Sequence, residues 1–382
     1  MISGVVLVIL FAACFWRQEG SQVKLLLFII LASSSILKAQ KVTGPLVLNN
    51  ERLPVTAKEF YMAGITDNRA DRSAVAWLLP PGPGNPEKYT VDLKGGALAS
   101  IKQFVTTALP PDRTLRPIFI HIEQFRLDEA ALPGNRIEGK VKVSLSFYLQ
   151  KDDQNIHLTN YNGSAGYNRH VNQEVDIEMV LRRALEYSLT FFNTWINKEV
   201  GTNIKLARDV KITFTDYTEQ PEGDTIYYSP KRPLQWDDFK AAPLRNSRFG
   251  AEVLPSIGYD EDVEVSKSII HVHLNTKAFV PKSACWVKDD SKNAYSLNHE
   301  QRHFDIVKII IERFKQKLKA EKLPVDNYDG PINVDYLESY HEMNVMQEQY
   351  DAETAHGMNV AVQEQWNKKI DKELKVVSLS SE

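Results

Sequence analysis

The chain contains little cysteine: its 382 residues include two, Cys14 and Cys285. Because we expect the segment with Cys14 to be removed, only Cys285 would remain, which excludes an internal disulfide. The chain also lacks an unbroken apolar run of about 20 residues, the length with which a helix crosses a bilayer. Stability must therefore come from hydrophobic cores, and the length favours two domains.

An excess of basic residues is missing as well. The chain has 46 Lys and Arg against 49 Asp and Glu, for a formal net charge of -3. A mildly acidic chain does not carry the positive surface with which proteins bind phosphate backbones, so we expect no nucleic-acid partner. Its 25% of charged and 43% of hydrophobic residues are typical of a globular protein.

Residues 1–39 differ from the rest. Two apolar runs, 5–16 and 25–37, are each too short to span a membrane. The second run follows Lys24 and leads through small residues to Ala39, an order typical of a secretory signal. We therefore predict a signal peptide cleaved near Ala39, or an uncleaved anchor made of both runs. Either reading implies an exported protein, periplasmic or secreted, with membrane association through this segment only.

Residues 40–217 are predicted to form an α+β envelope-type module. Strand-like patterns precede and follow a helical pattern at 97–109, and a longer amphipathic helix is expected at 174–200. This order indicates a largely antiparallel sheet covered by two helices. The segment 218–233 has the turn residues of a linker, so we place the domain boundary there.

Residues 218–382 are predicted to form a mainly helical domain with a small sheet. Short strand patterns at 256–266 and 268–280 precede a helical region from Tyr295 to about Val377. The first helix, expected at 295–319, contains the pattern His299-Glu300-x-x-His303. Residues four apart lie on the same face of a helix, so both imidazoles can reach one zinc ion at about 2.0 Å. Glu300, rotated from them by about 100°, is placed to take a proton from a water on that ion.

This pattern does not stand alone in the sequence. Four other segments accompany it: "RPLQWDDFK" (232–240), "KSACWVK" (282–288), "QYDAETAHGMN" (349–359) and "QEQW" (363–366). The five segments together resemble a family of bacterial exported proteins described as predicted secreted zinc-dependent proteases. The resemblance covers about residues 230–376. It implies a zincin-like domain with Zn²⁺ as cofactor and a protein or peptide as substrate.

A catalytic zinc site needs a third protein ligand and a position for water. We predict His356 as that ligand, because it lies just before Gly357, where a helix is expected to end. Asp351 and Glu353 are the alternatives, since carboxylates also complete such sites. Tyr350 could stabilise an oxyanion, although packing is the preferred interpretation.

Other histidines are given no metal role. His271 and His273 lie on one face of an expected strand, which favours a polar face, and His121, His157 and His170 are scattered singly. The sequence thus predicts a zinc peptidase of the cell envelope. The alternative is a non-catalytic binding or structural module with a structural metal or none.

Overall fold

The computed structural model describes residues 24–26, 44–84, 87–151, 154–244 and 246–379. It divides into two compact units, Met1–Val200 and Gly201–Glu382. The expected signal peptide or anchor, with Ala39 and Cys14, lies outside the described residues apart from the short strand β1 (Lys24–Leu26). No helix in the described part of the chain is both long enough and apolar enough to span a membrane.

The first unit is built on a seven-stranded sheet in the order β1-β7-β6-β5-β3-β4, with β2 also paired to β5. Its long strands form an antiparallel meander: β5 (Arg116–Leu132), β6 (Arg136–Lys151) and β7 (Gln154–His170). The other strands are β2 (Phe60–Asp67), β3 (Ala76–Leu78) and β4 (Tyr89–Val91). Both β2 and β3 run parallel to β5, so the sheet is mixed rather than wholly antiparallel.

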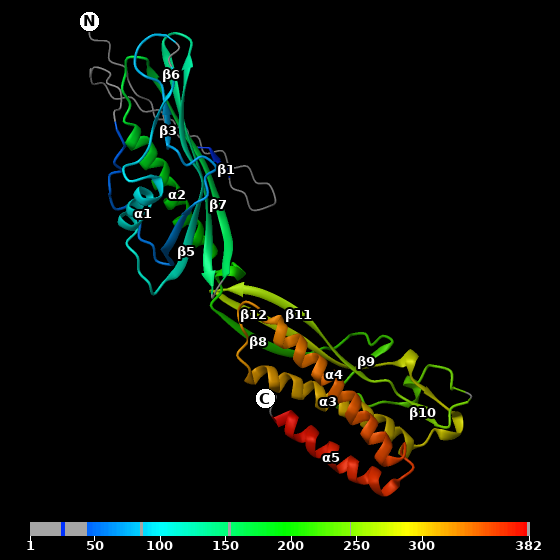
Figure 1. Cartoon of the computed structure of the whole chain (residues 1–382). Coiled ribbons are helices and arrows are strands. Elements are labelled where there is room, and N and C mark those ends of the chain that lie inside the picture. The colour runs from blue at the N-terminus through cyan, green and yellow to red at the C-terminus, as the bar shows by residue number, and fades with distance from the viewer. Residues whose placement is uncertain (1–23, 27–43, 85–86, 152–153, 245, 380–382) are drawn as a thin grey trace. The chain divides into compact units, whose positions relative to one another are not determined.

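Two helices pack on this sheet, as the sequence predicts: α1 (Ala97–Ala108) and α2 (Ile177–Glu199) (Figure 1). Asp176 caps α2 by accepting a hydrogen bond from the Met179 backbone N–H at 3.0 Å. The buried side of α2 packs Phe192 on Phe147 and Phe60, with ring centroids 4.2 and 4.9 Å apart. The period of the apolar residues thus identifies both the helix and the face it buries.

A buried ion pair crosses the same sheet. The Glu129 carboxylate, 1% exposed, accepts from the Arg169 guanidinium at 2.7 and 2.8 Å, from Tyr167 Oη at 2.6 Å and from the Leu79 backbone N–H at 2.8 Å. The carboxylate is therefore fully satisfied inside the core, and it supplies the negative charge that balances the buried Arg169.

In its described residues, the second unit combines small sheets with three α-helices. Its four-stranded sheet has the order β11-β12-β8, with β9 also paired to β12, and β10 pairs with β13 in a separate two-stranded sheet. The strands are β8 (Asp209–Asp216), β9 (Thr225–Tyr227), β10 (Ala251–Glu252), β11 (Ser256–Ser266), β12 (Ile269–Pro281) and β13 (Trp286–Val287). The helices are α3 (Ala294–Ala320), α4 (Asp329–Thr354) and α5 (Val360–Leu379).

The expected domain boundary at 218–233 is displaced. Strand β8 lies before that segment, yet it pairs in parallel with β12 from Asp209–Ile269 to Asp216–Thr276. Strand β9 lies within the expected linker and pairs with the end of β12. Residues 201–233 therefore belong to the second unit, and the division falls at Val200–Gly201.

Candidate metal centre

Helix α3 carries both motif histidines on its buried side. Asn293 caps the helix through the Ser296 backbone N–H at 2.9 Å. Its apolar positions, which include Phe304, Val307, Ile311, Phe314 and Leu318, are buried in the core of the second unit. His299 and His303 lie beside this stripe and are 7% and 8% exposed. The expected helix and its expected buried face are both confirmed.

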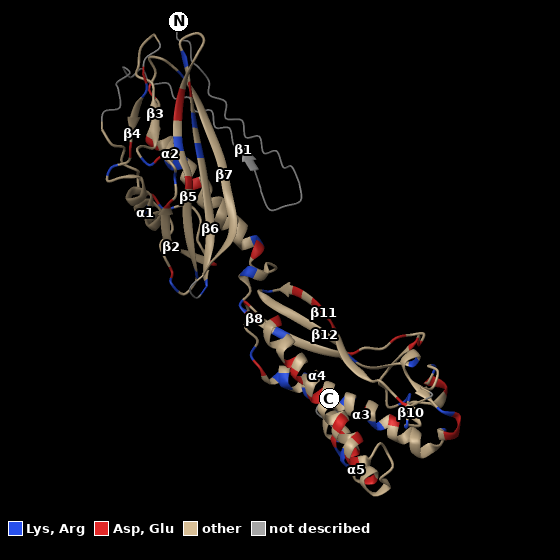
Figure 2. Ribbon diagram, turned by 45° about the vertical axis from the view of Figure 1, so that its right-hand side comes forward, with Lys and Arg blue, Asp and Glu red and all other residues tan. Residues whose placement is uncertain are grey.

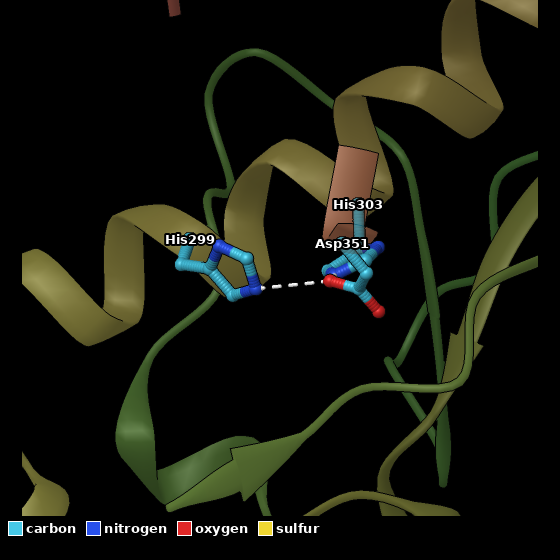
Figure 3. Close-up of side chains that lie close together, drawn as sticks. All are labelled: His299, His303 and Asp351. Atoms are coloured by element: carbon cyan, nitrogen blue, oxygen red, sulfur yellow. Dashed lines mark ion pairs between the residues drawn. The ribbon is translucent and has the colours of Figure 1, made fainter. Parts of the chain in front are cut away.

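Helix α4 supplies the third member of the cluster from near its C-terminal end. The ligand atoms of His299, His303 and Asp351 lie within 4.8 Å of one another. Asp351 Oδ1 is 3.3 Å from His299 Nε2 and 3.0 Å from His303 Nε2. Figure 3 shows the two rings and the carboxylate directed toward one another. Within the described ranges this is the one such group of His, Cys, Asp or Glu that the structure contains.

Two glutamines set the orientation of the histidine rings. His299 Nδ1 lies 2.9 Å from Gln363 Oε1, and His303 Nδ1 lies 2.5 Å from Gln347 Oε1. The Gln363 amide is fixed by its own Nε2, which donates to Tyr350 Oη at 2.6 Å. An amide oxygen only accepts, so the neutral tautomer that satisfies both glutamines has its proton on Nδ1. In that neutral form each Nε2 keeps a lone pair, the form in which a histidine binds a metal.

The chemistry of these donors suits a cation. Three electron-rich atoms converge, and the buried Asp351 Oδ1 has no partner with hydrogen-bond geometry. Without a proton or an ion between them, such atoms repel one another and their desolvation is costly. Donors held 2.0–2.1 Å from a tetrahedral zinc ion are about 3.3 Å apart, close to the separations of 3.3 and 3.0 Å found here. The three residues could therefore hold a metal ion.

The charges of the cluster are coupled. Burial raises the pKa of the Asp351 carboxyl, but His299 and His303 outweigh burial and hold that pKa well below its ordinary value. Burial lowers the pKa of His303, but Asp351 and Glu300 outweigh it and hold that pKa above the ordinary 6.5. The carboxylate thus remains ionised, as a ligand must be.

Glu300 is buried next to the cluster, with 6% of its surface exposed. Its Oε2 accepts a hydrogen bond from the Val253 backbone N–H at 3.0 Å. Burial is the largest influence on this carboxyl and raises its pKa above the ordinary value, against the opposing effect of the two histidines. A raised pKa makes the carboxylate a stronger base than that of an ordinary glutamate.

The predicted third ligand, His356, is not a member of the cluster. Helix α4 ends in a left-handed turn, with φ of 51° at Ala355, 52° at His356 and 78° at Gly357. The turn places His356 Nδ1 3.4 Å from Asp351 Oδ2, on the far oxygen of the carboxylate. Its ring packs on Phe249, with the centroids 4.1 Å apart. Asp351, one of the two alternatives, is the third member of the cluster.

The other candidates have structural partners. Glu353 is exposed and accepts from Trp366 Nε1 at 2.8 Å. Tyr350 is fully buried, stacks on His299 and lies 3.3 Å from the His299 carbonyl oxygen, in line with a packing role. His273 lies 3.0 Å from the hydroxyls of both Thr213 and Thr215. These contacts explain the residues without a metal.

A cleft of about 1220 Å³ opens over the cluster. One wall is formed by nine consecutive residues, 248–256, which include β10. The opposite side is formed by α3, α4 and the turn after α4. All three cluster residues and Glu300 line this cleft, so a bound ion would be reached by substrate and water.

The two orienting glutamines were not assigned a role from the sequence. Gln347 lies at helical spacing from Tyr350, Asp351 and Thr354, and this spacing could have placed it on the face that meets the histidines. Gln363 comes from α5, and nothing in its local pattern links it to α3. Only the packing of the three helices brings it to His299.

Comparisons with known proteins add little. No family model and no curated protein matches the chain. A crystal structure of protein XCC0632 from Xanthomonas campestris, of family DUF330, is similar to part of it, with 12% sequence identity and a TM-score of 0.28. The match covers 41% of this chain and 97% of that one. A similarity this low carries no argument about fold or function.

Proposed function

We propose that the second unit is a zinc-dependent peptidase in which His299, His303 and Asp351 hold the ion. The observation that carries the proposal is the convergence of two imidazole Nε2 atoms on one buried carboxylate oxygen that has no hydrogen-bond partner. When bound, zinc would supply a Lewis acid that acidifies a water molecule and polarises a carbonyl group. With three protein ligands the site keeps a position for water, as catalytic zinc sites do.

In this proposal Glu300 moves the proton. It lines the same cleft as the ligands, and its Oε2 is occupied by the Val253 N–H. The other oxygen, Oε1, takes the proton from the attacking water and returns it to the amine that leaves. The raised pKa of Glu300 favours this second step, because the protonated carboxyl group persists to a higher pH than that of an ordinary glutamate.

We further propose that the unit is zincin-like and acts outside the cytoplasm. Support for the first point is that the motif helix α3 packs against β12, while a later helix supplies the third ligand. Support for the second point is the signal-like pattern of residues 1–39. The substrate would then be a protein or peptide of the cell envelope.

The test is the variant Glu300→Gln in the full chain. Glutamine keeps an acceptor for the Val253 N–H, so we expect an intact fold and zinc content equal to that of the parent. Loss of the base should lower hydrolysis of a peptide by at least about 100-fold. Equal hydrolysis by the two proteins would remove Glu300 from the mechanism.

A non-catalytic module with a structural metal is the second candidate. His356 favours it, because Nδ1 is only 3.4 Å from Asp351 Oδ2. If that imidazole became a fourth ligand, the sphere would be closed to water. In this case His356→Ala should weaken zinc binding as much as His303→Ala does. In the peptidase account His303→Ala has by far the larger effect.

A further inference from the structure

The direction of the cleft follows from contacts at three points along the 248–256 wall. At one end Phe249 packs on His356. In the middle the Val253 N–H donates to Glu300. Just past the other end, the Ile257 carbonyl oxygen accepts from Tyr336 Oη at 3.2 Å. The wall therefore runs along the helices, from the turn after α4 toward the first half of α4, and passes Glu300 midway.

Contacts along α3 and α4 indicate the same direction for the cleft. Near the first end, Tyr295 Oη donates to the Gly357 carbonyl oxygen at 2.6 Å. One turn further along α3 is His299, and one turn further again is His303 with its partner Gln347. Earlier on α4, Met343 and Tyr340 also line the cleft. The reactive centre thus lies between two arms of the cleft rather than at its end.

Both arms carry large apolar side chains that reach solvent. The arm beside the turn after α4 is lined by Phe249, Tyr295 and Met358, and the last of these is 79% exposed. The other arm is lined by Leu254, Pro255, Tyr340 and Met343, with Leu254 50% and Tyr340 42% exposed. Exposed apolar side chains grouped around a cleft are typical of binding surfaces.

The occupant must suit the length and charge of the cleft. Residues 251–256 lead from β10 into β11 and span up to about 20 Å, enough for several residues of an extended chain. Apart from Glu300 and Asp351, the cleft is lined by three carboxylates, Glu252, Asp290 and Glu348, and by one full cation, Arg248. This balance disfavours an acidic ligand.

We propose that the cleft binds an extended polypeptide segment with large apolar residues on both sides of the reactive centre. Resting on the proposed function, this makes the protein an endopeptidase for apolar, non-acidic segments. Such segments are buried in folded proteins and exposed in unfolded ones. An enzyme that trims chain ends would need one closed arm with a charge for the terminus, whereas both arms here reach solvent through exposed side chains.

The experiment uses the full chain and synthetic decapeptides with acetylated and amidated ends. One peptide carries Leu and Phe in its middle, a second carries Ser there, and a third carries Glu. Binding is measured by fluorescence anisotropy with zinc removed by chelator, and cleavage is measured by mass spectrometry with zinc present. The variants are Leu254→Asp and Tyr340→Asp. The matched control is Leu337→Asp, on the same helix as Tyr340, 65% exposed and outside the cleft lining.

We expect the apolar peptide to bind about tenfold more tightly than the Ser peptide, and to be cleaved internally. Leu254→Asp and Tyr340→Asp should each remove most of that preference, and Leu337→Asp should leave it unchanged. Equal binding of all three peptides, or cleavage of the apolar sequence only when the same peptide is made with free ends, would overturn the inference while leaving a peptidase in place. Preferential binding that depends on Leu254 and Tyr340, without cleavage, would support the occupant and refute the proposed function.

Discussion

The turn after α4 offers a sharp test of how the metal centre is held. Gly357 has φ of 78°, and a Cβ added there would lie 3.3 Å from both Cγ and Nδ1 of His299. Alanine at this position costs about 1–2 kcal/mol for the left-handed backbone alone. In addition, the His299 ring must move by a few tenths of an ångström to make room for the new Cβ. Its Nδ1 is the atom that lies 2.9 Å from Gln363 Oε1, so the movement disturbs the hydrogen bond that orients the ligand.

We therefore expect Gly357→Ala to lose stability and also to bind zinc about tenfold more weakly, at the lower end of the effect of groups that orient ligands. Gly134→Ala is the matched control, because Gly134 has φ of 77° and nothing within 4 Å of its added Cβ. Zinc affinity is measured against a competing chelator, and stability by urea unfolding. If Gly357→Ala binds zinc as tightly as Gly134→Ala, the contact between the turn and His299 does not position the ligand.

Four further outcomes are expected. Asp351→Asn should reduce zinc affinity, measured by calorimetry, by more than about 100-fold, because residues that only orient a ligand already contribute about 10- to 100-fold. An unchanged affinity would exclude the carboxylate as a ligand. Gln363→Leu should reduce zinc affinity by about 10- to 100-fold in the same titration. Gln349→Leu is the control and should leave the affinity unchanged, because the Gln349 side chain donates to Glu353 on the outer face of α4. The zinc affinity should fall as the pH falls, and the fall should begin above pH 6.5, because the raised pKa of His303 lets protons compete earlier than at an ordinary histidine; an affinity that stays constant down to pH 5 would contradict this. Glu129→Ala should destabilise the first unit by about 3–5 kcal/mol in urea unfolding because it strands a buried arginine, without a change in zinc affinity.

Local patterns were enough to predict much of the fold. The apolar spacing of α1, α2 and α3 identified each helix within a few residues. The domain boundary was misplaced because it depends on the pairing of β8 with β12, about 60 residues apart in sequence. Turn-rich composition at 218–233 marks the surface of a domain as readily as its edge.

The part of the candidate site that lies within a single helix could be predicted from the sequence. His299 and His303 are four residues apart on one helix, so their proximity follows from helix geometry. The choice between Asp351 and His356 was not settled by the sequence, because it depends on where α4 ends. The helix continues to Thr354, which keeps Asp351 on the face toward α3, and the left-handed turn then carries His356 to the outer oxygen of the carboxylate.

The charge balance of the sequence was used only to argue against a nucleic-acid partner. Lysines, arginines and acidic residues are interspersed along the helices of the second unit (Figure 2). Several of them pair: Lys308 and Lys315 both contact Glu312, and both also contact Asp216 on β8. The balanced composition read from the sequence thus corresponds to ion pairs that join α3 to the sheet.

Titration of zinc into the metal-free full chain tests the central claim most directly. The account predicts one saturable site per chain, lost in Asp351→Asn and in His303→Ala. Absence of saturable binding, or a site that persists in both variants, would contradict the claim that these residues hold a metal ion.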